Sequence, residues 1–291
     1  MAKPPTKTKK TSASKTPEAK ASDLPNYVDY SDSGKDEQGV FIILGKTGVG
    51  KTFSWLSISD YRTNLVGPEP KMRDMEDLVL AEADSLGSAG LKHNNMRVRR
   101  FVFGRALAEG KSIGYALNKF IEFLLLPSVW STDLKVGVDL TGLDRFMFAQ
   151  NVKASKGSPN KFEAYRLNFL DHVEFSQMIK GTNLHICYMC HGRQANEGDK
   201  DAVVKLPGGG EIVPDLIGQA PKFYKTDASL QVAVVAKRGP KDKKFQRELL
   251  FGLEADSKGY EGKNRFEGLI PDRQSPPNLR EILRIINRGK R

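Results

Sequence analysis

The residues with the clearest chemistry lie together near residue 50. They match the phosphate-loop pattern G-x-x-x-x-G-K-[ST] at every defined position. Its glycines let backbone N–H groups approach phosphate oxygens closely. Lys51 is expected to reach the β- and γ-phosphates, and the Thr52 hydroxyl to face Mg²⁺. The run therefore predicts a nucleoside triphosphate site made of Gly45, Lys46, Thr47, Gly48, Val49, Gly50, Lys51 and Thr52.

A carboxylate is needed on the metal side of such a site. Asp139 directly follows the short apolar run 136–138, and a carboxylate at a strand end can hold the water shell of Mg²⁺, which is the task of a Walker B aspartate. Asp144 lies one helical turn further on, where a cap or a surface residue is the simpler interpretation. Asp139 is the predicted metal-side carboxylate.

Two further side chains follow apolar runs and are candidates for work at the same edge. Glu82 ends the run 78–81 and is a candidate for orienting the attacking water, with Asp84 as the competing residue. His191 ends the run 184–190 and is a candidate for contacting the γ-phosphate. Ligands of open α/β sheets bind at the carboxyl ends of strands, which favours these positions. Solvated loop acids and an exposed histidine remain the alternatives.

Cys187-Tyr188-Met189-Cys190-His191 spells the C-x-x-C-H string of c-type haem attachment and also contains a zinc half-site. Residues three apart on a strand point to opposite faces, so the two sulfurs are not expected to converge. The sequence also holds only these two cysteines. We therefore predict buried strand cysteines, with neither haem nor zinc.

The elements that must position these residues alternate between strand and helix patterns. Short β-branched runs read as buried strands, and apolar residues at helical spacing read as helices. This alternation predicts an α/β fold with a mostly parallel sheet flanked by helices. The expected strands are 40–44, 78–81, 98–103, 136–138, 184–190, 230–236 and 249–253. One helix is expected to begin at Thr52, and two more are expected over 106–126 and 162–180. The apolar face of the last helix consists of Phe162, Tyr165, Phe169 and Val173.

The composition of the chain limits the classes of protein to which it can belong. The chain has 291 residues, 39% hydrophobic and 28% charged, with a net charge of +11. Residues 1–20 carry six lysines against Glu18, and residues 280–291 carry five basic residues against Glu281. We predict a disordered tail over 1–38, a folded domain over 39–285 and a basic tail over 286–291. The N-terminal tail serves either solubility or tethering. No apolar run is long enough for a membrane span, and a soluble cytoplasmic protein is expected.

Two segments are candidate nucleic-acid loops, because both combine basic residues with glycine. Residues 150–161 contain three lysines, and residues 192–211 contain three basic and four acidic residues. The basic residues are Lys153, Lys156 and Lys161 in the first loop and Arg193, Lys200 and Lys205 in the second.

The motifs in this order resemble the phage-type RecA-like ATPases, AAA-domain nucleotide-binding proteins of which some act in single-strand annealing or recombination. The resemblance covers about residues 39–285 and rests on the phosphate loop followed by LVLAEADSLGS, VGVDLTGLDRF, HICYMCHGR, GGGEIVPDLIGQAPKFYKTDASLQV and GYEGKNRFEGLIP. It implies a RecA-like P-loop NTPase core, ATP with Mg²⁺, and assembly into a ring or filament. At the second strand the chain reads Glu82-Ala83-Asp84 instead of the usual glutamate-glycine ending.

The resemblance also implies roles for Lys51, Thr52, Asp139 and His191 as above, and for Lys263 and Arg265 at the γ-phosphate of a neighbouring subunit. A basic residue supplied in trans makes hydrolysis conditional on assembly; a solvated basic turn is the alternative. The function that follows is ATP-dependent action on single-stranded DNA in phage recombination, repair or replication, inside an infected bacterial host. The alternatives are a nucleotide-switched assembly factor that binds no DNA and a helicase or packaging motor.

Overall fold

The computed structural model describes part of the chain, and the described residues belong to one compact unit, Gln38–Arg291. The predicted N-terminal tail lies outside them. They are 40–58, 78–83, 98–110, 112–126, 134–182, 184–194, 212–238, 245–260, 264–266 and 268–289.

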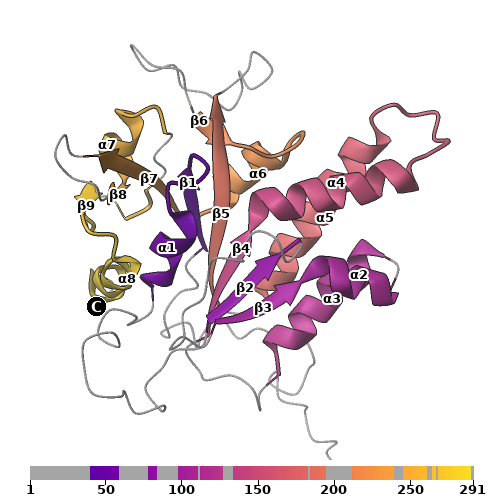
Figure 1. Cartoon of the computed structure of the whole chain (residues 1–291), viewed down its shortest axis with the longest axis horizontal. Helices are drawn as coiled ribbons and strands as arrows, with labels where there is room; N and C mark the ends of the chain where they lie inside the picture. The colour runs from indigo at the N-terminus through magenta and orange to yellow at the C-terminus, as the bar shows by residue number, and fades with distance from the viewer. Residues whose placement is uncertain are drawn as a thin grey trace, which may run out of the picture. The chain divides into compact units, whose positions relative to one another are not determined.

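A nine-stranded, mostly parallel sheet organises this unit, in the order β3-β2-β4-β5-β1-β7-β8-β9, with β6 paired to β5 (Figure 1). The pairs from β3 through β7 are parallel. The β7–β8, β8–β9 and β5–β6 pairs are antiparallel. The strands are β1 (Val40–Gly45), β2 (Leu78–Glu82), β3 (Val98–Val102), β4 (Lys135–Asp139), β5 (His185–Gln194), β6 (Ile212–Pro214), β7 (Leu230–Arg238), β8 (Phe245–Leu250) and β9 (Arg273–Gln274).

Helices cover both faces of the sheet, which confirms the predicted α/β class. α2 to α6 pack on one face and α1 with α8 on the other. β1 is buried on both faces: Ile42 packs toward the first group and Ile43 toward the second. The helices are α1 (Lys51–Leu56), α2 (Phe103–Gly110), α3 (Ile113–Leu124), α4 (Leu140–Ala154), α5 (Glu163–Lys180), α6 (Ala220–Asp227), α7 (Gly252–Asp256) and α8 (Leu279–Gly289).

Several predicted boundaries are wrong for local reasons. The single helix expected over 106–126 is two helices, because Ser112 caps α3 by accepting a hydrogen bond from the Tyr115 N–H at 3.1 Å. The strand expected over 249–253 ends at Leu250, and Gly252, at φ +45°, begins α7. α4 continues to Ala154 inside the expected loop 150–161. α8 continues past residue 285, with Ile286 buried.

The face of α5 that packs inward is also not the predicted one. Phe162 is 72% exposed and Tyr165 is 45% exposed, whereas the side chains of Asn168, His172 and Ser176 are buried. Aromatic residues at helical spacing usually mark the packed face of a helix. Here three polar residues share that face with Phe175 and Ile179, and each of the three forms at least one hydrogen bond within the protein.

Two of these residues, Asn168 and His172, bond to Asp144, which is fully buried rather than a cap or surface residue. Its Oδ1 accepts hydrogen bonds from His172 Nε2 at 2.7 Å and Asn168 Nδ2 at 2.9 Å, and its Oδ2 accepts one from the Ile217 N–H at 3.0 Å. A carboxylate only accepts, so His172 Nε2 carries a proton, and its Nδ1 is hydrogen-bonded to the Tyr224 hydroxyl at 3.1 Å. One carboxylate thus joins α4, α5 and the segment leading into α6.

Removing this carboxylate leaves two buried donors and the partly buried Ile217 N–H without an acceptor. We expect Asp144→Ala to lower the free energy of unfolding by about 3–5 kcal/mol, as for other buried pairs that lose one partner. Arg145→Ala is the matched control, because its exposed ion pair with Asp215 contributes at most about 1 kcal/mol. Urea unfolding followed by circular dichroism measures both, and equal losses in the two variants would contradict the role given to the buried network.

Candidate nucleotide-binding site

The loop between β1 and α1 is closed by backbone conformations that only glycine adopts easily. Gly48 has φ +76° and Gly50 has φ +99°. A Cβ atom at Gly50 would collide with the guanidinium of Arg247. The Val49 N–H donates to the Lys46 carbonyl at 3.3 Å, so the loop turns sharply between strand and helix. The predicted strand–loop–helix arrangement is therefore present.

Lys51 turns back into this loop. Its side chain is buried, and Nζ donates to the carbonyls of Gly45 at 3.1 Å and Lys46 at 3.3 Å and to His191 Nδ1 at 3.0 Å. Burial lowers the pKa of Lys51, while Cys190 and Asp139 act in the opposite direction. The ammonium group is thus held by groups that a phosphate can replace as acceptor.

His191 meets Lys51 because of strand register. β5 lies between β1 and β4, and its parallel pairing places His191 beside Gly45. An ammonium group only donates, so Nδ1 of His191 accepts and Nε2 carries the proton. Burial and the positive charge of Lys51 lower the pKa of His191, against opposing effects of Asp139 and Asp215. The imidazole is therefore favoured in its neutral form.

Asp139 ends β4, one strand further from β1, beside Met189 of β5. Its Oδ1 accepts a hydrogen bond from the Gly142 N–H at 3.2 Å, which makes Asp139 the N-cap of α4. A side chain at Gly142 would meet the other carboxylate oxygen. The cap directs the carboxylate toward the edge of the sheet where Lys51 and His191 lie, and its charge acts on both.

Glu82 ends β2 and lies at the same edge of the sheet, next to β4. Its carboxylate is nearly buried and forms an ion pair with Arg100 of β3 at 2.5 Å. β4 and β5 separate β2 from β1, so at about 4.8 Å per strand Glu82 lies roughly 14 Å from the phosphate-loop strand. Asp84, its competitor, lies outside the described residues.

Arg265 lies near the amino ends of β1 and β7, whereas the phosphate loop follows the carboxyl end of β1. Its N–H donates to the Ser229 carbonyl at 3.2 Å, and the Ser229 N–H donates to the Val40 carbonyl at the start of β1. The exposed guanidinium contacts the Thr226 carbonyl at 3.5 Å. Lys263, like most of the segment 192–211, lies outside the described residues. Arg265 is therefore too far from Lys51 of its own chain to meet the same phosphate.

The two cysteines do not converge. Cys187 packs with the α1 side of the sheet and Cys190 with the α4 side, as their spacing predicts. Burial raises the pKa of both thiols, that of Cys190 to about 12. Within the described part of the chain no group of three or more histidine, cysteine or acidic residues is placed to hold a metal ion.

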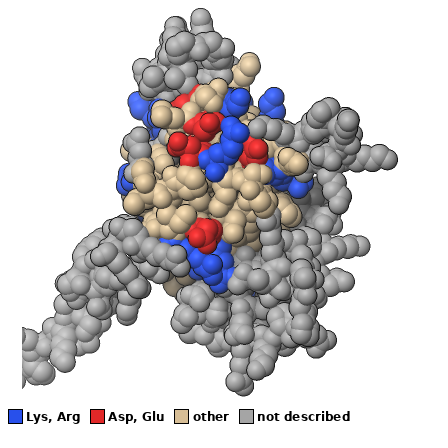
Figure 2. All heavy atoms as spheres, turned by 90° about the vertical axis from the view of Figure 1, so that its left-hand side faces the viewer, with Lys and Arg blue, Asp and Glu red and all other residues tan. Residues whose placement is uncertain are grey.

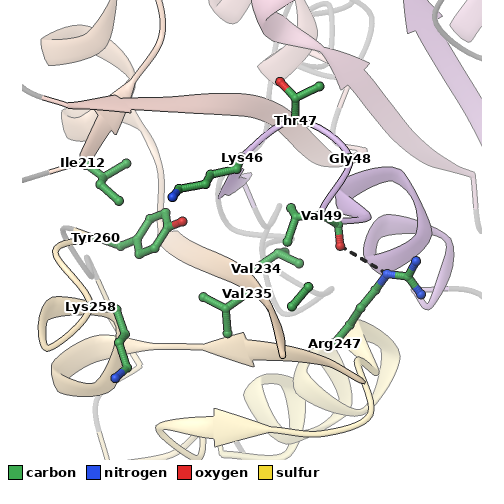
Figure 3. Close-up of a pocket in the computed structure, with 11 residues that line it drawn as sticks. Lys46, Thr47, Gly48, Val49, Ile212, Val234, Val235, Arg247, Lys258 and Tyr260 are labelled. Atoms are coloured by element: carbon green, nitrogen blue, oxygen red, sulfur yellow. Dashed lines mark hydrogen bonds between the residues drawn. The ribbon is translucent and has the colours of Figure 1, made fainter. Parts of the chain in front are cut away.

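A cavity of about 520 Å³ opens on the other side of the phosphate loop, over β7 and β8 (Figure 3). Its walls are largely apolar, with Ile212 and Val234 among them. Lys46 and Tyr260 extend toward one another across it (Figure 3). Arg247 borders it; its Nε donates to the Val49 carbonyl at 3.1 Å, and its guanidinium lies over the Phe53 ring.

Sequence reasoning missed three residues of this region. Thr141 accepts a hydrogen bond from the His191 N–H at 2.9 Å and contacts Cys190 Sγ at 3.2 Å; its place two residues after Asp139 was the available signal. Arg247 and Tyr260 lie about 200 residues from the loop along the chain, and no local spacing links them to it.

No protein-family model matches the sequence, and no curated protein matches it. Among solved structures, a KaiC-like protein of Pyrococcus horikoshii is 12% identical, with 74% of this chain and 78% of that one covered and a TM-score of 0.34. The flagellar accessory protein FlaH of Methanocaldococcus jannaschii is 10% identical, with 84% and 88% covered and a TM-score of 0.39. These likenesses are too low to argue function from.

Among the described helices, none has the length and apolar character to cross a membrane. Seen from the side of α7, α8 and β9, the described surface carries acidic and basic side chains close together (Figure 2).

The lowered pKa of His191 gives a pH dependence with a definite sign. The unfolded chain binds a proton at this histidine near pH 6.5, above the pKa of the folded protein, so acidification favours unfolding. We expect the free energy of unfolding of the wild type to fall relative to His191→Gln between about pH 7 and pH 5. Denaturant titrations at each pH measure this difference; a difference that stays constant with pH would contradict the lowered pKa.

Proposed function

We propose that this protein is a RecA-like ATPase that binds ATP with Mg²⁺, hydrolyses it within an oligomer, and acts on single-stranded DNA in phage recombination, repair or replication. One observation carries the proposal. The buried ammonium group of Lys51, which follows β1, lies with the neutral imidazole of β5 and the capped carboxylate that ends β4, where these three neighbouring strands end.

The residues fit a triphosphate with its metal. Lys51 has carbonyl and imidazole acceptors that phosphate oxygens can replace, and nothing lies within 4 Å of where a side chain at Gly48 would begin. The Thr52 hydroxyl and the Asp139 carboxylate are oxygen donors of the kind Mg²⁺ takes, and we assign them to it. Bound Mg²⁺ would neutralise charge that develops on the phosphates.

The cavity beside the loop supports an orientation for the nucleotide. His191 and Asp139 lie on the β5 and β4 side of the loop, where the γ-phosphate would point. The cavity lies on the β7 and β8 side and has the apolar walls and few polar groups that suit a base and its sugar. We assign the adenosine part to it, with Tyr260 and Arg247 as its polar contacts.

Glu82 is assigned the orienting of the attacking water. It ends the strand next to Asp139 and lies at the carboxyl edge of the sheet, where substrates of such folds bind. Its ion pair with Arg100 directs the carboxylate along the sheet toward β3, so the catalytic position requires a rotation away from that partner.

Hydrolysis is assigned to the assembled protein, with Lys263 and Arg265 reaching the γ-phosphate of a neighbouring subunit. Arg265 is exposed and lies at the end of the parallel strands opposite to the phosphate loop. A head-to-tail contact between subunits brings two such opposite ends together, and it repeats into a ring or a filament.

Single-stranded DNA is the proposed partner because exposed lysines gather where α4 ends. Lys153 lies in the last turn of α4, and Lys156 and Lys161 lie in the turn that leads to α5. Contacts of lysine with phosphates release counterions and supply affinity without reading sequence.

The phosphate site is tested by removing its charge. We expect Lys51→Ala to lower ATP affinity at least 100-fold while the protein stays folded, because the ammonium group serves the phosphates. Asp139→Asn is the matched variant: it should bind ATP but hydrolyse it at least tenfold more slowly, because it lacks the charge at the metal. Binding of a fluorescent ATP analogue and phosphate release measure the two effects. Wild-type affinity in a folded Lys51→Ala protein would refute the site.

The contribution in trans is tested by mixing variants. Arg265→Ala should bind ATP normally but hydrolyse it slowly, and addition of Lys51→Ala protein should restore activity, because that subunit carries an intact Arg265. Arg284→Ala, which removes an exposed arginine of α8, is the control and should behave as wild type. Activity per subunit should also fall on dilution, since the contact forms by mass action. Unchanged activity on dilution together with no rescue would show a self-contained ATPase.

A further inference from the structure

Two aromatic side chains at the start of α5 are largely exposed. Phe162 precedes the helix and is 72% exposed, and Tyr165 in its first turn is 45% exposed. The inward face combines the polar residues Asn168, His172 and Ser176 with Phe175 and Ile179, all of them buried. Exposed aromatic rings gathered at one place usually mark a binding surface, whereas single exposed apolar residues are ordinary.

Phe162, Tyr165 and Phe148 form a connected group of rings. Phe162 and Tyr165 have centroids 6.4 Å apart, and Phe148 of α4 supports Tyr165 at 4.9 Å. Further along α5, Phe169 packs edge to face on Phe223 of α6 at 6.0 Å. Tyr165 is thus fixed from behind while it stays accessible, which suits a platform for a planar ligand.

Three lysines precede these rings in the chain. Lys153 in the last turn of α4 and Lys156 and Lys161 in the turn that leads to Phe162 are all exposed. The nearby carboxylate of Glu163 is engaged by Arg166 at 2.5 Å, so it does not offset the lysines. Apolar rings among lysines suit a ligand with both flat apolar groups and anionic groups. Unpaired bases on a phosphate backbone have this chemistry.

We propose that Phe162 and Tyr165 form the surface on which unpaired bases of a single strand stack, with Lys153, Lys156 and Lys161 along the phosphates. The inference takes its partner from the proposed function and adds the site and the mode of contact. α4 connects this surface with the nucleotide site: Asp139 caps its start and Lys153 lies in its last turn, about 21 Å away at 1.5 Å per residue.

The test uses the full chain and a fluorescein-labelled oligothymidine, with binding followed by anisotropy. We expect Phe162→Ala/Tyr165→Ala to weaken binding at least tenfold. Removing one aromatic side chain from under a stacked base lowers the affinity roughly 5- to 150-fold. The dependence on salt should not change, since no phosphate contact is lost. The Lys153→Ala/Lys156→Ala/Lys161→Ala variant should instead reduce the slope of log affinity against log salt by about two.

Two further variants separate stacking from other effects. Phe162→Trp should keep the affinity and show quenching of tryptophan fluorescence by the oligonucleotide beyond that of the wild type. Leu253→Ala removes a side chain of α7 that is 71% exposed, and it should bind like the wild type. An abasic oligonucleotide of equal length should bind the wild type as weakly as oligothymidine binds the double alanine variant.

Each contrary result has a separate meaning. Wild-type affinity in the double alanine variant overturns this site but leaves the proposed function standing. No binding of oligothymidine by a wild type that still binds ATP removes the DNA partner, and this inference with it. Weaker binding that accompanies a change from oligomer to monomer in sedimentation shows that the face joins copies of the chain, and overturns the stacking surface.

Discussion

The structure around the phosphate loop depends on finding acceptors for one buried ammonium group. Lys51 is nearly removed from solvent, and an unpaired charge there would be costly. Two carbonyls of its own loop and the imidazole of His191 supply the acceptors. The carbonyls face inward only because the loop turns through glycines with positive φ. The imidazole is within reach only because β5 pairs with β1 in the register that sets His191 beside Gly45.

The same requirement explains the positions around His191. The Thr141 hydroxyl accepts a hydrogen bond from the His191 N–H, and the Asp215 N–H donates one to the His191 carbonyl at 2.7 Å. Asp144, three residues after Thr141, holds the Ile217 N–H and the helix α5. The elements that follow β4 and β5 are therefore tied to the strand ends by hydrogen bonds, and a change at His191 has a direct route to α4 and α6.

The strand pattern of the fold could be predicted because β-branched runs and glycine carry local signals. β1 alternates between the two cores along its length, as a buried run predicts. The inward face of α5 could not be predicted, because Asn168 and His172 become buried only through Asp144, more than twenty residues earlier. Likewise Arg247 reaches the cavity through the pairing of β7 with β8, and Tyr260 reaches it through the turn after α7. No residue spacing near the phosphate loop predicts either contribution.

The most direct measurement locates the base of a bound nucleotide on the protein. Photolysis of the protein with 8-azido-ATP, followed by mass spectrometry of the peptides, locates the base. We expect labelling within residues 245–260 or 212–238, competed by excess ATP and absent from Lys51→Ala. Labelling confined to the peptides of β4 and α4 would place the base where the γ-phosphate should lie and would overturn the proposed orientation of the nucleotide.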